Sequence, residues 1–142
     1  MKTQLTYLNL TLVLVLLSIG LAGQTNCSKD KIIGDWTYIN SFALRQPVDI
    51  DSLIRANESL RQTIGTWTFK EAGMYLFTVD TIIKQHDKGR FNVVQENCEI
   101  RLGTKKNTPE GLIFHILFLN EKYLVTKCTK PKGDYIYIHR RK

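Results

Sequence analysis

Three histidines and three cysteines have the widest chemical range in this sequence. His86, His115 and His139 are scattered over one predicted loop and two predicted strands, and no pair has the short spacing of a metal-binding motif. His115 lies in an apolar stretch and is expected to be a barrel residue. No glycine-rich loop precedes a helix to cradle phosphate. We therefore expect a protein that is not an enzyme, with no catalytic centre, metal site or cofactor.

The first segment of the chain has the layout of a secretory signal peptide. Lys2 precedes an apolar run, residues 10–22, that ends on small residues and is too short to span a bilayer comfortably. We expect residues 1–22 to be the signal peptide, 23–31 a lead or tether, and 32–142 one domain with one core. The protein is then exported, as a secreted, periplasmic or outer-membrane-tethered protein.

The rest of the sequence predicts eight strands and one helix. The strands are rich in β-branched and aromatic residues separated by turn residues, at 33–42, 65–70, 74–84, 90–95, 98–103, 112–119, 123–127 and 135–140. The helix lies within 51–62, where Asp51 can cap it and Leu53 and Leu60 share one side. Short hairpins between consecutive strands predict an all-β fold, an eight-stranded antiparallel up-and-down barrel with one short helix in the first long connection.

Two stretches of this chain are nearly the same. Residues 32–40 read IIGDWTYIN, and residues 63–69 read TIGTWTF. No third copy follows at the same period, so the second is interpreted as another aromatic core strand and not as an internal repeat.

A Gly-x-Trp on the first strand of a small β-meander resembles the lipocalin signature. The run from residue 32 through GTWTFKEAGMYLF to YIYIHRRK is similar to the small lipocalin-like, calycin-type domains of Bacteroidota secreted proteins and lipoproteins. This resemblance implies that Gly34 allows a close backbone approach and that Trp36 plugs the closed end of the barrel. It also implies that Arg140, with Arg141 as the second choice, lies across the indole.

Strand alternation predicts which residues face the interior and which end is open. The expected lining is apolar, consisting of Trp67, Phe69, Phe91, Val93, Ile100, Phe114 and Ile116. The connections at 43–63, 85–89, 104–111 and 128–134 share the open end. The predicted basic mouth at this end comprises Lys84, Arg90, Lys105, Lys106 and Lys127.

The cysteines leave two alternatives open. Three cysteines in an oxidising compartment allow one disulfide, and strand sorting favours Cys27 with Cys98, because Cys128 finishes its strand at the opposite end of the barrel. Cys27 also lies where bacterial lipoproteins carry an acylated cysteine, although the preceding Gln-Thr-Asn lacks small residues. Lipidation would bring the protein to a membrane and leave Cys98 and Cys128 as thiols.

These features predict a non-catalytic binding protein. The net charge of +7 and the basic mouth favour a hydrophobic or anionic amphiphilic small molecule carried in the barrel of a monomer. Export argues against a nucleic-acid partner. The alternative is a barrel filled with side chains that acts as an interaction module or inhibitor through its basic open-end loops. Large inward aromatic residues would favour this alternative, and a measured cavity would favour the carrier.

Overall fold

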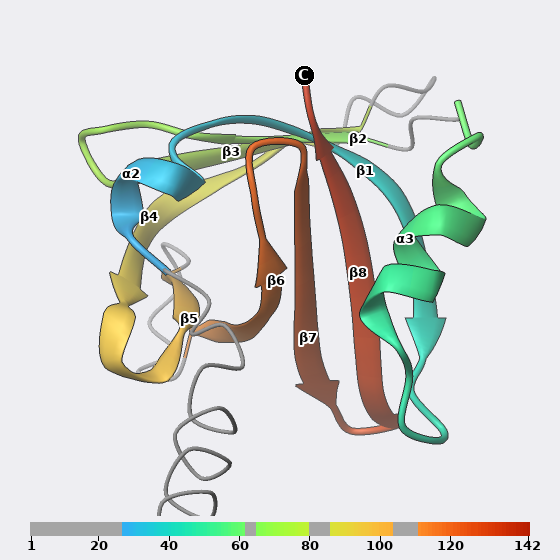
Figure 1. The fold of residues 1–142 in the computed structure, drawn as a ribbon. Coiled ribbons are helices and arrows are strands. Elements are labelled where there is room, and N and C mark those ends of the chain that lie inside the picture. Colours follow the sequence, from blue (N-terminus) through green and yellow to red (C-terminus); the bar gives the residue numbers. More distant parts are fainter. Residues whose placement is uncertain (1–26, 62–64, 80–85, 104–110) are drawn as a thin grey trace, which may run out of the picture.

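The computed structural model describes residues 27–61, 65–79, 86–103 and 111–142. Eight strands form a closed barrel in which each strand pairs antiparallel with the next and β8 returns to β1 (Figure 1). They are β1 (Gly34–Ala43), β2 (Gly65–Phe69), β3 (Met74–Val79), β4 (His86–Val94), β5 (Glu99–Gly103), β6 (Leu112–Leu119), β7 (Tyr123–Lys130) and β8 (Gly133–Arg141). The predicted all-β, up-and-down barrel is confirmed. The proposed signal peptide, with Lys84, Lys105 and Lys106, lies outside the described residues.

Within the described residues, two short α-helices and one 3-10 helix accompany these strands. α2 (Lys29–Ile32) lies at the closed end, and η1 (Gln95–Asn97) joins β4 to β5. α3 (Ile50–Asn57) occupies the first long connection, as predicted, and runs beside β1 and β8 (Figure 1). Its cap is Asp49, not Asp51: the Asp49 carboxylate accepts hydrogen bonds from the backbone N–H groups of Asp51 and Ser52. The helix therefore begins before the predicted segment.

The apolar side chains form two clusters, one on each side of the barrel wall. The inner cluster fills the barrel from Ile32 and Trp36 at the closed end up to Trp67 and Phe114. The outer cluster buries Val125, Ile136 and Ile138 on the outside of the wall, where α3 contributes Ile50, Leu53 and Ile54. β7 and β8 therefore have apolar surroundings on both faces. One face of each strand lines the barrel interior, and the other face packs in the outer cluster.

Two connections at the open end differ from their predicted positions. The expected turn at 85–89 is wrong, because β4 already begins at His86. Gly89 lies within this strand, where a Cβ atom would come 2.2 Å from the Gly103 carbonyl oxygen and 2.9 Å from Tyr75 Cε1. The glycine therefore permits close packing across the sheet instead of making a turn. β7 likewise continues to Lys130, whose register partner is Gly133, so a tight turn replaces most of the expected loop.

Candidate functional site

The closed end is a plug built around Trp36. Trp36 has no exposed surface, and its indole N–H donates a 2.7 Å hydrogen bond to the carbonyl oxygen of Ile32 in α2. The guanidinium of Arg141 lies 4.4 Å from the centre of the indole ring and donates hydrogen bonds to the Lys31 and Ile33 carbonyl oxygens. Gly34 has a φ of +128°, and a Cβ there would lie 3.4 Å from Arg141 Nη1.

Arg141, not Arg140, covers the tryptophan, which corrects the first choice made from the sequence. The register of β1 with β8 pairs Trp36 with Arg141, so these two side chains lie on the same face. Arg140 faces outward, where its guanidinium lies 5.8 Å from the Tyr123 ring and donates a hydrogen bond to the Glu58 carbonyl oxygen.

A disulfide between Cys27 and Cys98 fastens this plug to the barrel. Their Cα atoms are 5.3 Å apart, within the ordinary range for a disulfide. Cys27 is buried with Ile32 in the inner cluster, so the described part of the predicted lead packs onto the barrel. A disulfide at Cys27 excludes an acyl group on the same sulfur. Cys128 is not paired; it is buried, and its burial raises the pKa of its thiol.

The seven predicted lining residues all contribute to the inner cluster. Phe69, Phe91, Ile100 and Ile116 are buried in it, and Trp67, Val93 and Phe114 pack against them. The rings contact one another closely: the centroids of Phe69 and Phe91 are 4.9 Å apart, and those of Trp67 and Phe69 are 5.8 Å apart and stacked. The closed half of the barrel is therefore filled with aromatic and aliphatic side chains.

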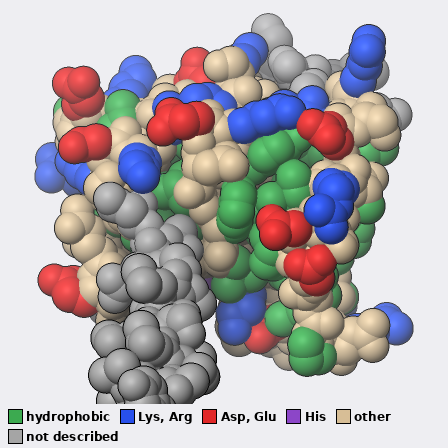
Figure 2. Space-filling view, in the orientation of Figure 1, with side chains coloured by type: hydrophobic (Ala, Val, Ile, Leu, Met, Phe, Trp, Pro, Cys, Tyr) green, Lys and Arg blue, Asp and Glu red, His purple; other side chains and the backbone are tan. Residues whose placement is uncertain are grey.

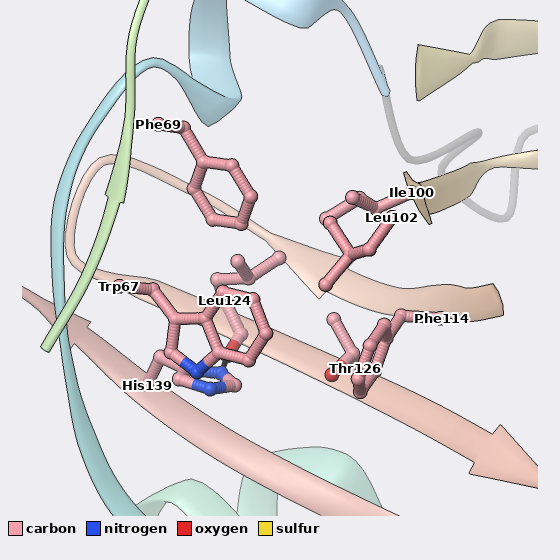
Figure 3. A pocket seen from close by; sticks show the side chains of 8 residues that line it. All are labelled: Trp67, Phe69, Ile100, Leu102, Phe114, Leu124, Thr126 and His139. Atoms are coloured by element: carbon pink, nitrogen blue, oxygen red, sulfur yellow. Dashed lines mark hydrogen bonds between the residues drawn. The ribbon is translucent and has the colours of Figure 1, made fainter. Parts of the chain in front are cut away.

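A small cavity remains above this packing. Its volume is about 20 Å³, and it is lined by Trp67, Phe69, Ile100, Leu102, Phe114, Leu124, Thr126 and His139 (Figure 3). That volume holds about one water molecule. Pockets for drug-sized ligands measure roughly 300 to 1,000 Å³, so this cavity does not enclose such a molecule.

Two polar side chains face the apolar cavity. His139 is buried, and this burial lowers the pKa of its imidazole from 6.5 to about 4. Its Nδ1 lies 3.3 Å from the Leu124 carbonyl oxygen, and a neutral ring that donates from Nδ1 keeps Nε2 as an acceptor. The hydroxyl oxygen of Thr126 is buried and has no hydrogen-bond partner. Neither residue was among the predicted site residues.

Towards the open end the inner wall includes four half-buried aromatic residues that lie near one another. This open-half wall comprises Tyr38, Phe114, Tyr135 and Tyr137. The Tyr137 centroid lies 5.8 Å from that of Phe114 and 6.3 Å from that of Tyr38, while Lys130 Nζ lies 5.3 Å from both the Tyr135 and the Tyr137 centroids. Lys130 was expected in the open-end connection at 128–134 and was not among the predicted binding residues, whereas the structure places it at the end of β7. The alternation of Tyr135, Tyr137 and His139 on one strand face was the available signal.

Of the predicted basic mouth, the structure describes Arg90 and Lys127. Arg90 is exposed and lies within β4, between Met74, the first residue of β3, and Gly103, the last residue of β5. Lys127 lies within β7, and its ammonium is 3.5 Å from the Asp134 carboxylate. Both residues lie within strands rather than at strand ends, because β4 begins earlier and β7 ends later than predicted. His115 faces outward, 3.6 Å from the Glu99 carboxylate, so it does not face the interior.

A metal-binding cluster and a membrane-spanning helix are both absent from the part of the chain that the structure describes. Within residues 27–61, 65–79, 86–103 and 111–142, no three metal-ligating side chains of histidine, cysteine, aspartate or glutamate gather at one place. Over the same residues, no helix is long and apolar enough to cross a membrane.

Among known proteins, a DUF4847 family protein from Bacteroides vulgatus is a structural neighbour. Its crystal structure has a TM-score of 0.44 and 13% sequence identity, and the match covers 74% of this chain and 90% of that chain. No protein-family model matches the sequence, and no curated protein matches it.

Proposed function

We propose that this protein is a non-catalytic binding protein that holds the apolar part of a small molecule against the open-half wall of its barrel. The observation that carries this proposal is that wall itself: the rings of Tyr38, Phe114, Tyr135 and Tyr137 remain half-buried, whereas the rings and aliphatic side chains of the closed half are mostly buried. Half-buried rings on a concave inner surface provide apolar area that a ligand can cover.

The filled closed half limits how deep a ligand can reach. Trp67, Phe69 and Phe114 close the space above the Trp36 plug, and the cavity among them is about 20 Å³. The ligand therefore lies along the wall near the mouth and does not replace the core. Because all eight strands are paired around the barrel, the fold has no open sheet edge, which supports a monomer.

A second candidate is an interaction module that binds a partner protein through its open-end loops. The observation that favours it is the small cavity, since a filled barrel needs no internal ligand. The two candidates differ in what the aromatic wall does: it binds a small molecule in the first and only supports the loops in the second.

Two further parts of the proposal concern fold type and location. We propose that the barrel is lipocalin-like, supported by Gly34 and Trp36 on the first strand and by the Arg141 guanidinium over the indole. We also propose export, supported by the apolar run at residues 10–22 and by the Cys27–Cys98 disulfide, since disulfides persist in oxidising compartments.

Tryptophan fluorescence tests the proposed ligand site, because the ring of Trp67 packs against the wall. Trp67 lies 5.8 Å from Phe114 in the wall, whereas Trp36 is fully buried at the closed end. We expect the neutral dye N-phenylnaphthylamine to bind and to quench Trp67 by energy transfer in the Trp36→Phe variant. Trp36 is replaced in this variant because it pairs with Trp67 across β1 and β2 and would be quenched as well.

Native mass spectrometry of the exported, mature protein completes this test. A small molecule that stays bound under native conditions and is lost on denaturation would support the first candidate and identify the ligand. Failure of the dye to bind, together with a bare polypeptide mass, would reject the first candidate and favour the interaction module.

A further inference from the structure

Lys130 holds a fixed position at the edge of the open-half wall. It is the last residue of β7, and its Nζ lies 5.3 Å from the ring centres of both Tyr135 and Tyr137. Cation–π attraction to two rings restrains the long side chain. A hydrogen bond to the Tyr137 hydroxyl raises the pKa of Lys130, so the residue is cationic at neutral pH. The wall therefore has a positive charge at a defined place.

Lys130 differs in its partners from Lys127 and Lys122, two lysines that lie outside the open-half wall. Lys127 pairs with Asp134 at 3.5 Å, and Lys122 pairs with Glu58 at 2.8 Å. Among the described residues, no carboxylate forms an ion pair with Lys130. Its ammonium is exposed, so an incoming anion meets a positioned charge without first displacing a described carboxylate.

An apolar surface extends inward from this charge. The Tyr137 ring packs edge-on against Phe114 and is tilted against Tyr38, and Phe114 in turn packs edge-on against Trp67. The Tyr38 hydroxyl donates a 2.7 Å hydrogen bond to Ser41, so its hydrogen already has a partner. The surface is thus basic at its outer edge and aromatic along its length.

We propose that Lys130 is the anion-recognition point of the open-half wall, and that the ligand is an amphiphile with one oxyanion head group, a carboxylate or a phosphate. The assignment rests on the proposed function, because it names the ligand class for that same wall. The oxyanion accepts a charge-assisted hydrogen bond from Lys130, and the apolar chain or ring covers Tyr137, Tyr38 and Phe114. A neutral head group lacks the charge-assisted bond, and a cationic one is repelled.

A series of ligands with one apolar chain and different head groups separates these effects. Isothermal titration calorimetry would compare decanoate, decyl phosphate, decanol and decyltrimethylammonium, the three ions below their critical micelle concentrations and decanol below its solubility limit. We expect decanoate and decyl phosphate to bind at least about tenfold more tightly than decanol, which is the ratio one charge-assisted hydrogen bond supplies. The two anions identify which head group the site prefers, and the cation should bind most weakly.

Variants of one hairpin assign the effect to Lys130. Lys130→Met keeps much of the side-chain length and removes the charge, so it should abolish the preference for decanoate over decanol. Lys130→Arg should retain most of the preference. Lys132→Met is the matched control: it removes the same charge from the adjacent turn, where no ring contact is formed, and should leave the preference nearly intact.

The outcomes distinguish failure of this inference from failure of the proposed function. Equal affinities for decanoate and decanol in the unchanged protein would overturn the role of Lys130 while leaving a ligand-binding wall. An equal loss of preference in Lys130→Met and Lys132→Met would also overturn it, because the preference would then come from net charge alone. If neither decanol nor decanoate binds, the proposed function itself fails, and the inference fails with it.

Discussion

At the scale of single residues, His139 shows what burial in this barrel does to an ionisable group. The imidazole lies among apolar side chains, and its one recorded hydrogen-bond partner is the Leu124 carbonyl oxygen. Burial disfavours the charged ring, which is why its pKa falls to about 4. No described carboxylate forms an ion pair with this imidazole. The folded protein therefore keeps His139 neutral.

We predict that acidification destabilises the protein through this histidine. The pKa is 6.5 in the unfolded chain and about 4 in the folded one, so the unfolded state binds more protons between these values. The neutral ring contributes its full share to the free energy of unfolding above about pH 6.5, and this contribution is lost as the pH falls towards about 4. We expect the free energy of unfolding in urea to fall by about 2 kcal/mol between about pH 7.5 and pH 5.

Two variants isolate the contribution of His139. His139→Leu should remove most of the pH dependence in this interval, because the leucine does not titrate. His115→Gln should preserve it, because the side chain of His115 is 43% exposed on the outer face. A His139→Leu protein with an unchanged pH profile would contradict the prediction.

The two arginines that end β8 give a second prediction at this scale. Arg141 stacks on the buried indole of Trp36 and donates to two carbonyl oxygens of the N-terminal segment, whereas Arg140 donates to one carbonyl oxygen at the surface. We expect Arg141→Met to lower the free energy of unfolding by about 2 kcal/mol and Arg140→Met by about half as much. Urea denaturation measures both, and a larger loss in Arg140→Met would refute the assignment of Arg141 to the plug.

At the scale of elements, the strands were more predictable than the connections between them. β-Branched and aromatic runs separated by turn residues located all eight strands, because each run packs against its neighbours on a pleated surface. The turn at 85–89 failed because Gly89 packs against Tyr75 within β4, and a glycine suits close packing as well as a turn. Sequence spacing does not distinguish these two uses.

The candidate site was predictable only where strand alternation was undisturbed. Trp67, Phe69 and Phe114 were assigned to the interior, and the structure places them there. Lys130 was expected in an open-end loop and not among the binding residues, because the sequence does not show that β7 runs on to the tight turn. The register shift in β1 between Tyr38 and Asn40 likewise changes which later side chains face inward. Such register shifts depend on how strands pair around the closed barrel. The sequence of one strand does not predict this pairing.

The disulfide gives a prediction for the α2 element. Cys27 and Cys98 are separated by 71 residues, and closing a loop of this length stabilises a fold by about 4 kcal/mol in the chain-entropy model. We expect the Cys27→Ser, Cys98→Ser double variant to lose about that much free energy of unfolding. Both sulfurs belong to the closed end, so α2 and the Trp36 plug should loosen first.

The remaining cysteine provides the control for this measurement. Cys128→Ser replaces a buried thiol that takes no part in a disulfide. The change in the free energy of unfolding that this substitution causes should therefore be the same with and without reducing agent. The unchanged protein should lose stability when dithiothreitol is added, and the double variant should not respond. Equal stability of the unchanged protein with and without dithiothreitol would contradict the structural role of the disulfide.

At the scale of the whole molecule, the barrel has a closed half and an open half with different packing. Trp36, Tyr75 and Leu124 are almost fully buried in the closed half, whereas Leu112 at the open end of β6 is 48% exposed. On the outside, apolar side chains gather over β6, β7 and α3, with both signs of charge around them (Figure 2). The outer cluster thus supports the long strands β7 and β8, which carry Lys130 and the tyrosines of the wall.

This asymmetry predicts unequal hydrogen exchange along the barrel. Amides of Thr37 in β1 and Leu124 in β7 lie between two buried clusters, so they should exchange only through global unfolding. Amides of Ile113 and Phe114 in β6 should exchange at least about a hundredfold faster, through local opening of the less buried half. Decanoate should slow exchange in the open half while leaving Thr37 and Leu124 nearly unchanged. Uniform exchange rates in all eight strands would mean that the barrel opens as one unit, and the open half would then not be a separately adaptable binding surface.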